Sequence, residues 1–99
     1  MVEAASLLRL DDVIDEKSRR AIMAIIYVED SSFGYLQHKT GLTAGNLGAH
    51  LRVLEEAGYI QVKKTFLERR PHSSYRITEK GRRAFKEYVA KLEDALLKH

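Results

Sequence analysis

Apolar residues in the first third of the chain recur at helical spacing. The strongest segment lies between residues 16 and 28, where isoleucine, methionine and alanine leave almost no polar face. This pattern predicts a core helix over 16–28, with Asp11, Asp12 or Asp15 available as its N-cap. Before it, the small residues and leucines of 2–10 predict a short helix or an ordered arm.

Two further helical segments follow, with a tight turn between them. The pattern predicts a helix over 33–39, preceded by two serines that can cap it, and a turn at Gly41. Thr43 is the expected N-cap of a helix over 44–57. A helix-turn-helix over 33–57 with a glycine in its turn is typical of modules that read DNA.

Beyond residue 58 the apolar spacing changes to every second position. Ile60 and Val62 alternate with polar residues, and Tyr75 and Ile77 do so later, which predicts the two strands of a β-hairpin over 59–77. This hairpin follows directly on the helix-turn-helix and is basic. Such a strand pair after a short, polar-faced helix strengthens the prediction of a DNA-reading module.

The end of the hairpin and the last helix complete the predicted organisation. The polar segment 67–72 contains Pro71, so we expect it to be a loop with a basic tip rather than part of the strands. Thr78 caps a final predicted helix over 79–98 that carries one apolar stripe. With no linker and no internal repeat, the expected fold is a single domain over 1–99, mostly α with a small β-hairpin (α+β).

Charge is distributed unevenly along the chain. Residues 61–86 hold nine Lys and Arg against two Glu, a local charge of +7, whereas the whole chain carries +3. A basic cluster beside a predicted recognition helix is expected for a protein that binds a polyanion. A solvated Lys and Arg surface is the alternative, and it explains the clustering less well.

The helix predicted over 44–57 has one narrow apolar sector, formed by Leu47, Leu51 and Leu54, which must be buried. The opposite face is small and polar. Glycine inside a helix costs about 1 kcal/mol relative to alanine, so Gly45 and Gly48 need a reason. Close approach to DNA is one reason, and tight packing of Gly48 on the helix before it is another.

Other residues of the two elements expected to face DNA also have two possible roles, one structural and one in DNA contact. Thr43 is an N-cap or a DNA contact, and His50 is a half-buried histidine or a base reader. Arginines at the hairpin tip protect an edge strand or enter a minor groove. The residues that we expect to contact DNA are Thr43, Gly45, Asn46, Ala49, His50, Arg52, Lys63, Lys64, Arg69, Arg70, His72 and Arg76.

The segment LTAGNLGAHLRVLEEAGYIQVKK, a basic hairpin and then YRITEKGRRAFKEYV resemble the winged-helix regulators related to the MarR and ArsR groups. Most similar are the small archaeal and bacterial "winged helix DNA-binding domain" proteins. The resemblance covers about residues 11–89. It rests on L-T-x-x-N-L-x-x-H-L-x-x-L-E-x-A-G-Y and a downstream I-T-x-x-G-R.

This resemblance implies a homodimeric transcription factor that binds double-stranded DNA. It places the helix over 43–56 in the major groove and the tip over 67–72 at the flanking minor groove. It also implies that terminal helices over 1–10 and 79–98 form the dimer interface. The interface residues would be Leu7, Leu8, Phe85, Tyr88, Val89, Leu92 and Leu96.

The chain departs from the family at two points. Many relatives have Ser where Gly48 or Ala49 stands, so some polar contacts of that helix are missing here. The metal-sensing branch uses Cys with carboxylate and His ligands, and this chain has no Cys. A small-molecule effector between the DNA-binding and dimer parts is suggested by analogy alone.

Composition and residue spacing argue against an enzyme or a membrane protein. The four histidines lack metal-ligand spacing, no glycine-rich phosphate loop follows a strand, and the acidic residues near position 11 are better explained by a capped helix than by a metal cluster. We therefore expect no catalytic residue, metal or cofactor. The N-terminus lacks the features of a signal peptide, and no apolar run approaches the roughly 20 residues of a membrane span.

Residue usage adds two weaker expectations. The chain has no Cys, one Asn and two Gln, with abundant Lys, Arg and Glu, which favours a cytoplasmic protein and leans towards a thermophilic one. Two alternatives to a sequence-specific regulator stay open at this point. One is a winged-helix protein-interaction module, and the other is a non-specific architectural DNA-binding protein.

Overall fold

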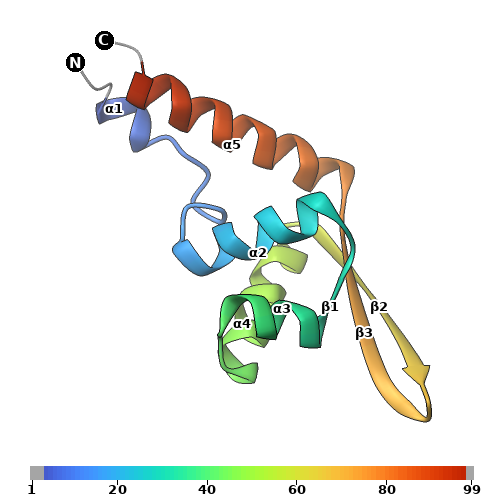
Figure 1. The fold of residues 1–99 in the computed structure, drawn as a ribbon. Coiled ribbons are helices and arrows are strands. Elements are labelled where there is room, and N and C mark those ends of the chain that lie inside the picture. Colours follow the sequence, from blue (N-terminus) through green and yellow to red (C-terminus); the bar gives the residue numbers. More distant parts are fainter. Residues whose placement is uncertain (1–3, 98–99) are drawn as a thin grey trace.

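A computed structural model describes residues 4–97 and shows five helices and three strands within them (Figure 1). A three-stranded antiparallel sheet has the order β1-β3-β2. The expected class, mostly α with a small β part, is confirmed. The elements are α1 (Ala4–Leu7), α2 (Lys17–Val28), β1 (Ser31–Ser32), α3 (Phe33–Thr40), α4 (Ala44–Glu56), β2 (Ile60–Leu67), β3 (Arg70–Ile77) and α5 (Glu79–Leu97).

The N-terminal elements differ in detail from their prediction. Helix α1 occupies one turn of the expected segment 2–10, the first two residues of which lie outside the described part of the chain. The N-cap of α2 is Glu16, whose side chain accepts a hydrogen bond from the Arg19 N–H at 2.9 Å. The expected caps are wrong, because Asp11 accepts instead from the backbone of its own turn, at Val13 and Ile14.

The helix-turn-helix over α3 and α4 agrees closely with the sequence pattern. Ser32 accepts from the Tyr35 N–H at 3.0 Å and caps α3. Gly41 ends that helix at φ 71°, a left-handed conformation that glycine adopts without steric cost. Thr43 then accepts from the Asn46 N–H at 3.1 Å and caps α4, as expected.

The β2–β3 hairpin, called the wing from here on, is longer than predicted. Its ladder continues to the pair Leu67↔Arg70, so the connection is the two-residue turn Glu68-Arg69 rather than a loop over 67–72. Both turn residues have positive φ, 52° and 68°, which is the sign pattern of a type I′ turn. The expectation of a long basic loop is therefore wrong.

Pro71 fits inside β3 because of its register. The pair that flanks a two-residue turn is hydrogen-bonded, and pairs then alternate, so Phe66↔Pro71 is a non-hydrogen-bonded pair. The nitrogen of Pro71 faces away from β2, and β1 pairs with β3 only at Ser74 and Tyr75. The missing N–H of proline thus interrupts no ladder bond.

The core lies between the sheet and the helices. Leu47, Leu51 and Leu54 of α4 are at most 1% exposed, which confirms the buried face deduced for this helix. They meet α2 and the sheet residues at the base of the wing. The core cluster consists of Leu10, Ile14, Ile22, Met23, Ile26, Leu36, Leu47, Leu51, Leu54, Ile60, Tyr75, Ile77 and Tyr88.

Thr78 and Gly81, the threonine and glycine of the I-T-x-x-G-R motif, join the wing to α5. Thr78 donates its N–H to the Tyr59 carbonyl at 3.0 Å and its hydroxyl to the Gly58 carbonyl at 2.6 Å, while its hydroxyl oxygen caps α5 by accepting from the Gly81 N–H. A Cβ at Gly81 would lie 2.1 Å from the Tyr59 carbonyl oxygen. Only glycine fits there, so the first turn of α5 packs directly on the strand entry.

A group of tyrosines and carboxylates ties the N-terminal segment to this junction. The Tyr59 hydroxyl donates to Asp11, and the Tyr88 hydroxyl donates to Asp15 at 2.8 Å while accepting from Arg20 at 2.8 Å. Burial, followed by the hydrogen bond to Asp11, raises the pKa of Tyr59 to about 12.

This pKa predicts that Tyr59 contributes to stability in a pH-dependent way. The hydroxyl must be protonated to donate to Asp11, and its folded pKa of about 12 lies above the unfolded value of about 10. Its contribution is therefore complete below about pH 10 and is lost as the pH rises towards 12. Urea unfolding of the parent and of Tyr59→Phe should show a stability difference that shrinks over this range. A difference that stays constant with pH would contradict the assignment.

Candidate nucleic-acid interface

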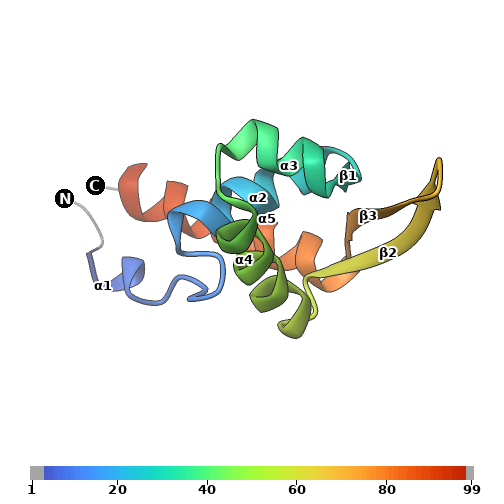
Figure 2. The same cartoon turned by 90° about the horizontal axis from the view of Figure 1, so that it is seen from below.

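Helix α4 and the wing reach the same side of the molecule. In Figure 1 both point downward, while α5 crosses the top, and the view from below shows α4 in front with the wing projecting beside it (Figure 2). The molecule is elongated, with extents of 56 × 26 × 20 Å. The two elements that the sequence marks for DNA contact therefore belong to one face.

The outward face of α4 is slender and open to solvent. Its predicted DNA-contact residues other than His50 are exposed, because the leucines of the same helix take up the buried side. The cap of α4 leaves the first backbone N–H groups pointing out of its N-terminus, where anions are favoured. The exposed residues are Thr43, Gly45, Asn46, Ala49 and Arg52.

The two interior glycines of α4 have no packing role inside the chain. A Cβ added at Gly45 or at Gly48 would meet no atom within 4 Å. The alternative that Gly48 allows tight packing on α3 is therefore wrong. Both glycines weaken the helix, and the packing of the described residues does not require either of them.

His50 differs from the other predicted contacts on α4. It is half-buried, with Nδ1 3.2 Å from Nη1 of Arg19 and 3.8 Å from Oε1 of Glu16. When Arg19 donates to Nδ1, the ring proton sits on Nε2. The ring is thus held against the start of α2, which favours the half-buried alternative over base reading.

The wing presents its cations at the surface. Lys63 and Lys64 of β2, Arg69 of the turn and Arg70 of β3 are all exposed, whereas His72 is half-buried. Left-handed conformations cost non-glycine residues roughly 1–2 kcal/mol each, and Arg69 occupies such a position at the tip. The tip therefore retains an arginine where local preference favours Asn or Gly.

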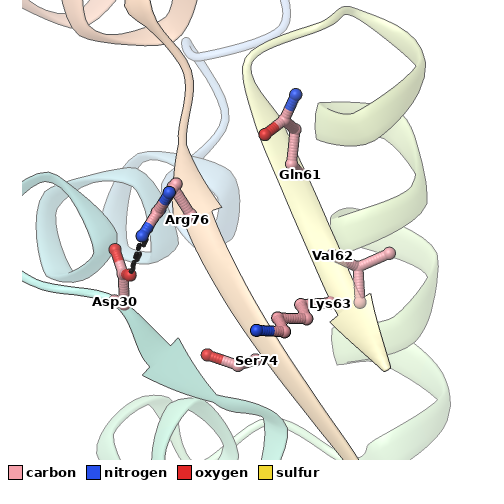
Figure 3. A pocket seen from close by; sticks show the side chains of 6 residues that line it. All are labelled: Asp30, Gln61, Val62, Lys63, Ser74 and Arg76. Carbon is pink, nitrogen blue, oxygen red and sulfur yellow. Dashed lines mark hydrogen bonds and ion pairs between the residues drawn. The ribbon is translucent and has the colours of Figure 1, made fainter. Parts of the chain in front are cut away.

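Arg76 lies at the root of the wing and is held by an ion pair. Its guanidinium donates to the Asp30 carboxylate from Nε at 3.3 Å and Nη2 at 3.2 Å, although its side chain is 69% exposed. Figure 3 shows the pair beside Gln61, Lys63 and Ser74, around a shallow hollow of about 210 Å³. Asp30 thus fixes the position of Arg76 and offsets part of its charge.

The residues expected at a dimer interface fall into three groups. Leu8 is 88% and Leu96 47% exposed, and the neighbouring Leu97, which the sequence argument missed, is 69% exposed. Tyr88 is 2% exposed and bonded inside its own chain, so it has no surface to offer a second one. Half-buried positions make up the third group: Leu7, Phe85, Val89 and Leu92.

An apolar hollow lies on α5 among these half-buried residues. It has a volume of about 360 Å³ and is lined by Tyr27 of α2 together with Phe85, Val89 and other residues of α5. The centroids of the Tyr27 and Phe85 rings, which both line it, lie 5.4 Å apart.

Residues 4–97 contain neither a candidate metal cluster nor a helix that could span a membrane. No group of three or more His, Asp or Glu side chains there could hold a metal ion. The carboxylates near the start of α2 instead have separate partners, with Asp11 bonded to Tyr59 and Asp15 to Tyr88 and Arg20. None of the helices in this range combines the length and apolarity needed to cross a bilayer.

Comparison with known proteins gives one family. A family model described as "winged helix DNA-binding domain" matches residues 18–96. The uncharacterized protein MJ0432 of Methanocaldococcus jannaschii is 44% identical over 72 residues, which are 72% of this chain and 78% of that protein.

Solved structures share the whole fold. A transcriptional regulator homologue from Pyrococcus horikoshii OT3 superposes with a TM-score of 0.86 at 26% identity, over 93% of this chain and 94% of that one. The homodimeric winged helix-turn-helix DNA-binding domain of Mb0332 from Mycobacterium bovis has a TM-score of 0.74 at 18% identity, over 97% and 86%. The chain therefore belongs to the winged helix DNA-binding domain family, with the fold of MarR- and ArsR-like regulators.

Proposed function

We propose that this protein is a transcriptional regulator that binds a specific double-stranded DNA site as a homodimer. In this proposal α4 enters the major groove and the wing contacts the flanking minor groove and backbone. The observation that carries it is the shared face of α4 and the wing, one element slender and the other cationic. Family membership supports the same function.

The proposal gives the residues of α4 different roles. The Asn46 side chain is exposed in the first turn and can bond a base edge, as amide side chains do with adenine. Thr43, besides capping the helix, and Arg52 are proposed to contact phosphates. His50 is left out of the proposed contact set, because its Nδ1 faces Arg19.

The wing contributes mainly charge. Lys63 and Lys64 are proposed to contact phosphates, which position the protein without reading sequence. Arg69 and Arg70 at the tip are proposed to enter the minor groove, where a narrow A·T tract attracts arginine. Arg76, already paired with Asp30, contributes to the positive field at the wing root.

A second copy of the chain is the proposed partner of the exposed leucines. Leu8 directly follows α1, and Leu96 and Leu97 end α5. Helix α1 and the C-terminal end of α5 lie together, away from α4 and the wing (Figure 1). Mb0332, which shares the fold, is described as homodimeric. A two-fold dimer would present two α4 helices to half-sites about one helical turn apart, so a pseudo-palindromic site is expected.

The experiment that tests this function is selection from randomised duplexes, followed by affinity measurements at several salt concentrations. We expect an enriched pseudo-palindrome and a binding constant that falls steeply with salt. Equal affinity for selected and random duplexes would replace the proposal by a non-specific architectural role. Binding that does not respond to salt, or no binding, would favour a protein-interaction module.

The glycines of α4 give a prediction in which stability and binding move in opposite directions. Gly45→Ala and Gly48→Ala should each stabilise the folded protein by up to about 1 kcal/mol, because alanine is the better helix former and its Cβ meets open space. If DNA approaches this backbone closely, the same methyl groups should lower affinity for the selected duplex. Urea unfolding and fluorescence anisotropy measure the two effects.

The matched control for the glycine variants is Gly34→Ala in α3, where an added Cβ also meets open space. It should leave DNA affinity unchanged. Unchanged affinity in all three variants would show that no groove floor approaches α4 at its glycines.

A further inference from the structure

The wing tip is apolar as well as cationic. Phe66 is 77% exposed and Leu67 60% exposed, and Pro71, opposite Phe66, is exposed too. These residues end a hairpin that projects away from the helices (Figure 2). Nothing in the core of the chain requires an aromatic ring there, because the core cluster ends at Tyr75 and the half-buried Val62.

Strand register separates these side chains into two faces. Side chains alternate along β2, so Phe66 shares a face with Ile60 and Val62, on the side of the sheet that packs on the helices. Leu67 lies on the other face. Phe66 and Pro71 form a non-hydrogen-bonded pair, in which side chains approach most closely, so the two rings lie together on the helix-facing side of the tip.

Cations outnumber the one carboxylate near these rings. Lys64 precedes Phe66 on the same face of β2, Arg69 lies in the turn beside Glu68, and Arg70 pairs with Leu67 on the opposite face. An apolar surface that served the core alone would not be bordered by three exposed cations against one carboxylate, Glu68. A DNA duplex fits both the apolar rings and the cations, because its stacked bases are apolar and lie between two anionic phosphate chains.

We propose that Phe66, backed by Pro71, is a wedge that enters the minor groove of the bound duplex, partly unstacks one base step and bends the DNA. This inference rests on the proposed function, since it needs the wing to lie at the minor groove. Minor-groove proteins that insert apolar side chains kink duplexes by about 20–90°. The arginines of the tip would lie in the minor groove beside the opened step, with their charges close to the phosphates of both strands.

The bend also gives the wing a way to favour some sequences without hydrogen bonds to bases. Pyrimidine–purine steps unstack most easily, so a wedge selects sites that carry such a step under the tip. The proposal thus predicts a flexible step, such as TA or CA, at a fixed distance from each half-site. Contact by arginine alone would favour an uninterrupted A-tract instead.

The test uses the full chain and a selected duplex labelled at its ends with a fluorescence donor and acceptor. At saturating parent protein, energy transfer should rise as the ends approach. Saturating Phe66→Ala should return transfer to the level of free DNA. Leu67→Ala is the matched control, because Leu67 is also an exposed apolar residue but lies on the opposite face of the same strand, and it should keep the bend.

A second probe reports the base step itself. An adenine analogue that brightens on unstacking, placed at the flanking minor groove, should brighten with the parent and Leu67→Ala at saturation but not with Phe66→Ala. Equal bending by the parent and Phe66→Ala, or a duplex that stays straight in the parent complex, would overturn the wedge while leaving DNA binding intact. Failure of the parent to bind any duplex would instead overturn the proposed function, and the wedge with it.

Discussion

Replacing Arg69 and Arg70 together by alanine should weaken DNA binding strongly at low salt and weakly at high salt. Both side chains are exposed at the end of the wing, so their removal changes charge and leaves the core untouched. Each lost phosphate contact should reduce the slope of log K against log salt by about 0.9, so the slope should fall by about 1.8 per bound chain. Fluorescence anisotropy across a salt series measures both quantities.

The control for this variant removes the same charge elsewhere. Lys86→Ala with Lys91→Ala takes two exposed cations from α5, which lies across the molecule from α4 (Figure 1). Its affinity should change little, and its salt slope should stay close to that of the parent. Equal losses in the two double variants would mean that total charge matters and that the wing has no special position at the DNA.

Introducing aspartate at Leu8 and Leu96 together should convert a dimer into a monomer. Both leucines are exposed in the single chain, so the change does not disturb its core, whereas two carboxylates buried in an apolar interface are strongly unfavourable. The sedimentation mass should fall from twice the chain mass to 11.3 kDa. Affinity for the two-half-site duplex should fall as well, because the half-sites would then be bound one at a time.

Val28→Asp is the matched control for the interface. Val28 is 80% exposed at the end of α2, on an element that is not proposed to take part in dimerisation. Its mass should equal that of the parent. A parent that sediments as a monomer, or a Leu8 and Leu96 variant that stays a dimer, would remove the terminal leucines from the proposed interface.

The helices of this protein could be predicted because their signals are local. Thr43 and Ser32 cap through side chains that reach the backbone three residues on, and Gly41 supplies a conformation that few other residues adopt. The buried face of α4 follows from its leucine spacing alone. These features depend on neighbours in sequence and are therefore visible there.

The sheet was harder to predict because its signals depend on register. β1 has only two residues and exists through its pairing with β3, so no alternation announces it. Proline in a polar segment predicts a loop over 67–72, yet the position of Pro71 in a non-hydrogen-bonded pair lets the ladder continue through it. The same lengthening of the wing brings Phe66 and Leu67 to the tip, which residue type alone did not indicate.

The surroundings of the remaining site residues depend on tertiary packing, which the sequence does not reveal. His50 and Tyr88 lie on faces whose partners come from α2, and only the folded chain shows Arg19 beside one and Arg20 beside the other. Gly48 shows the reverse case, because a close contact with α3 was one interpretation of the sequence, whereas a Cβ at Gly48 would meet open space. Exposure of Asn46, Arg52 and the wing cations matches the expectation, while their contacts with DNA remain a prediction.

The most direct test of the central claim is a titration of the ¹⁵N-labelled protein with a selected duplex, followed by NMR. The account predicts that backbone amide signals of residues 43–52 and 63–72 shift most, while those on the outer face of α5 stay in place. Shifts confined to α5, with α4 and the wing unchanged, would contradict it.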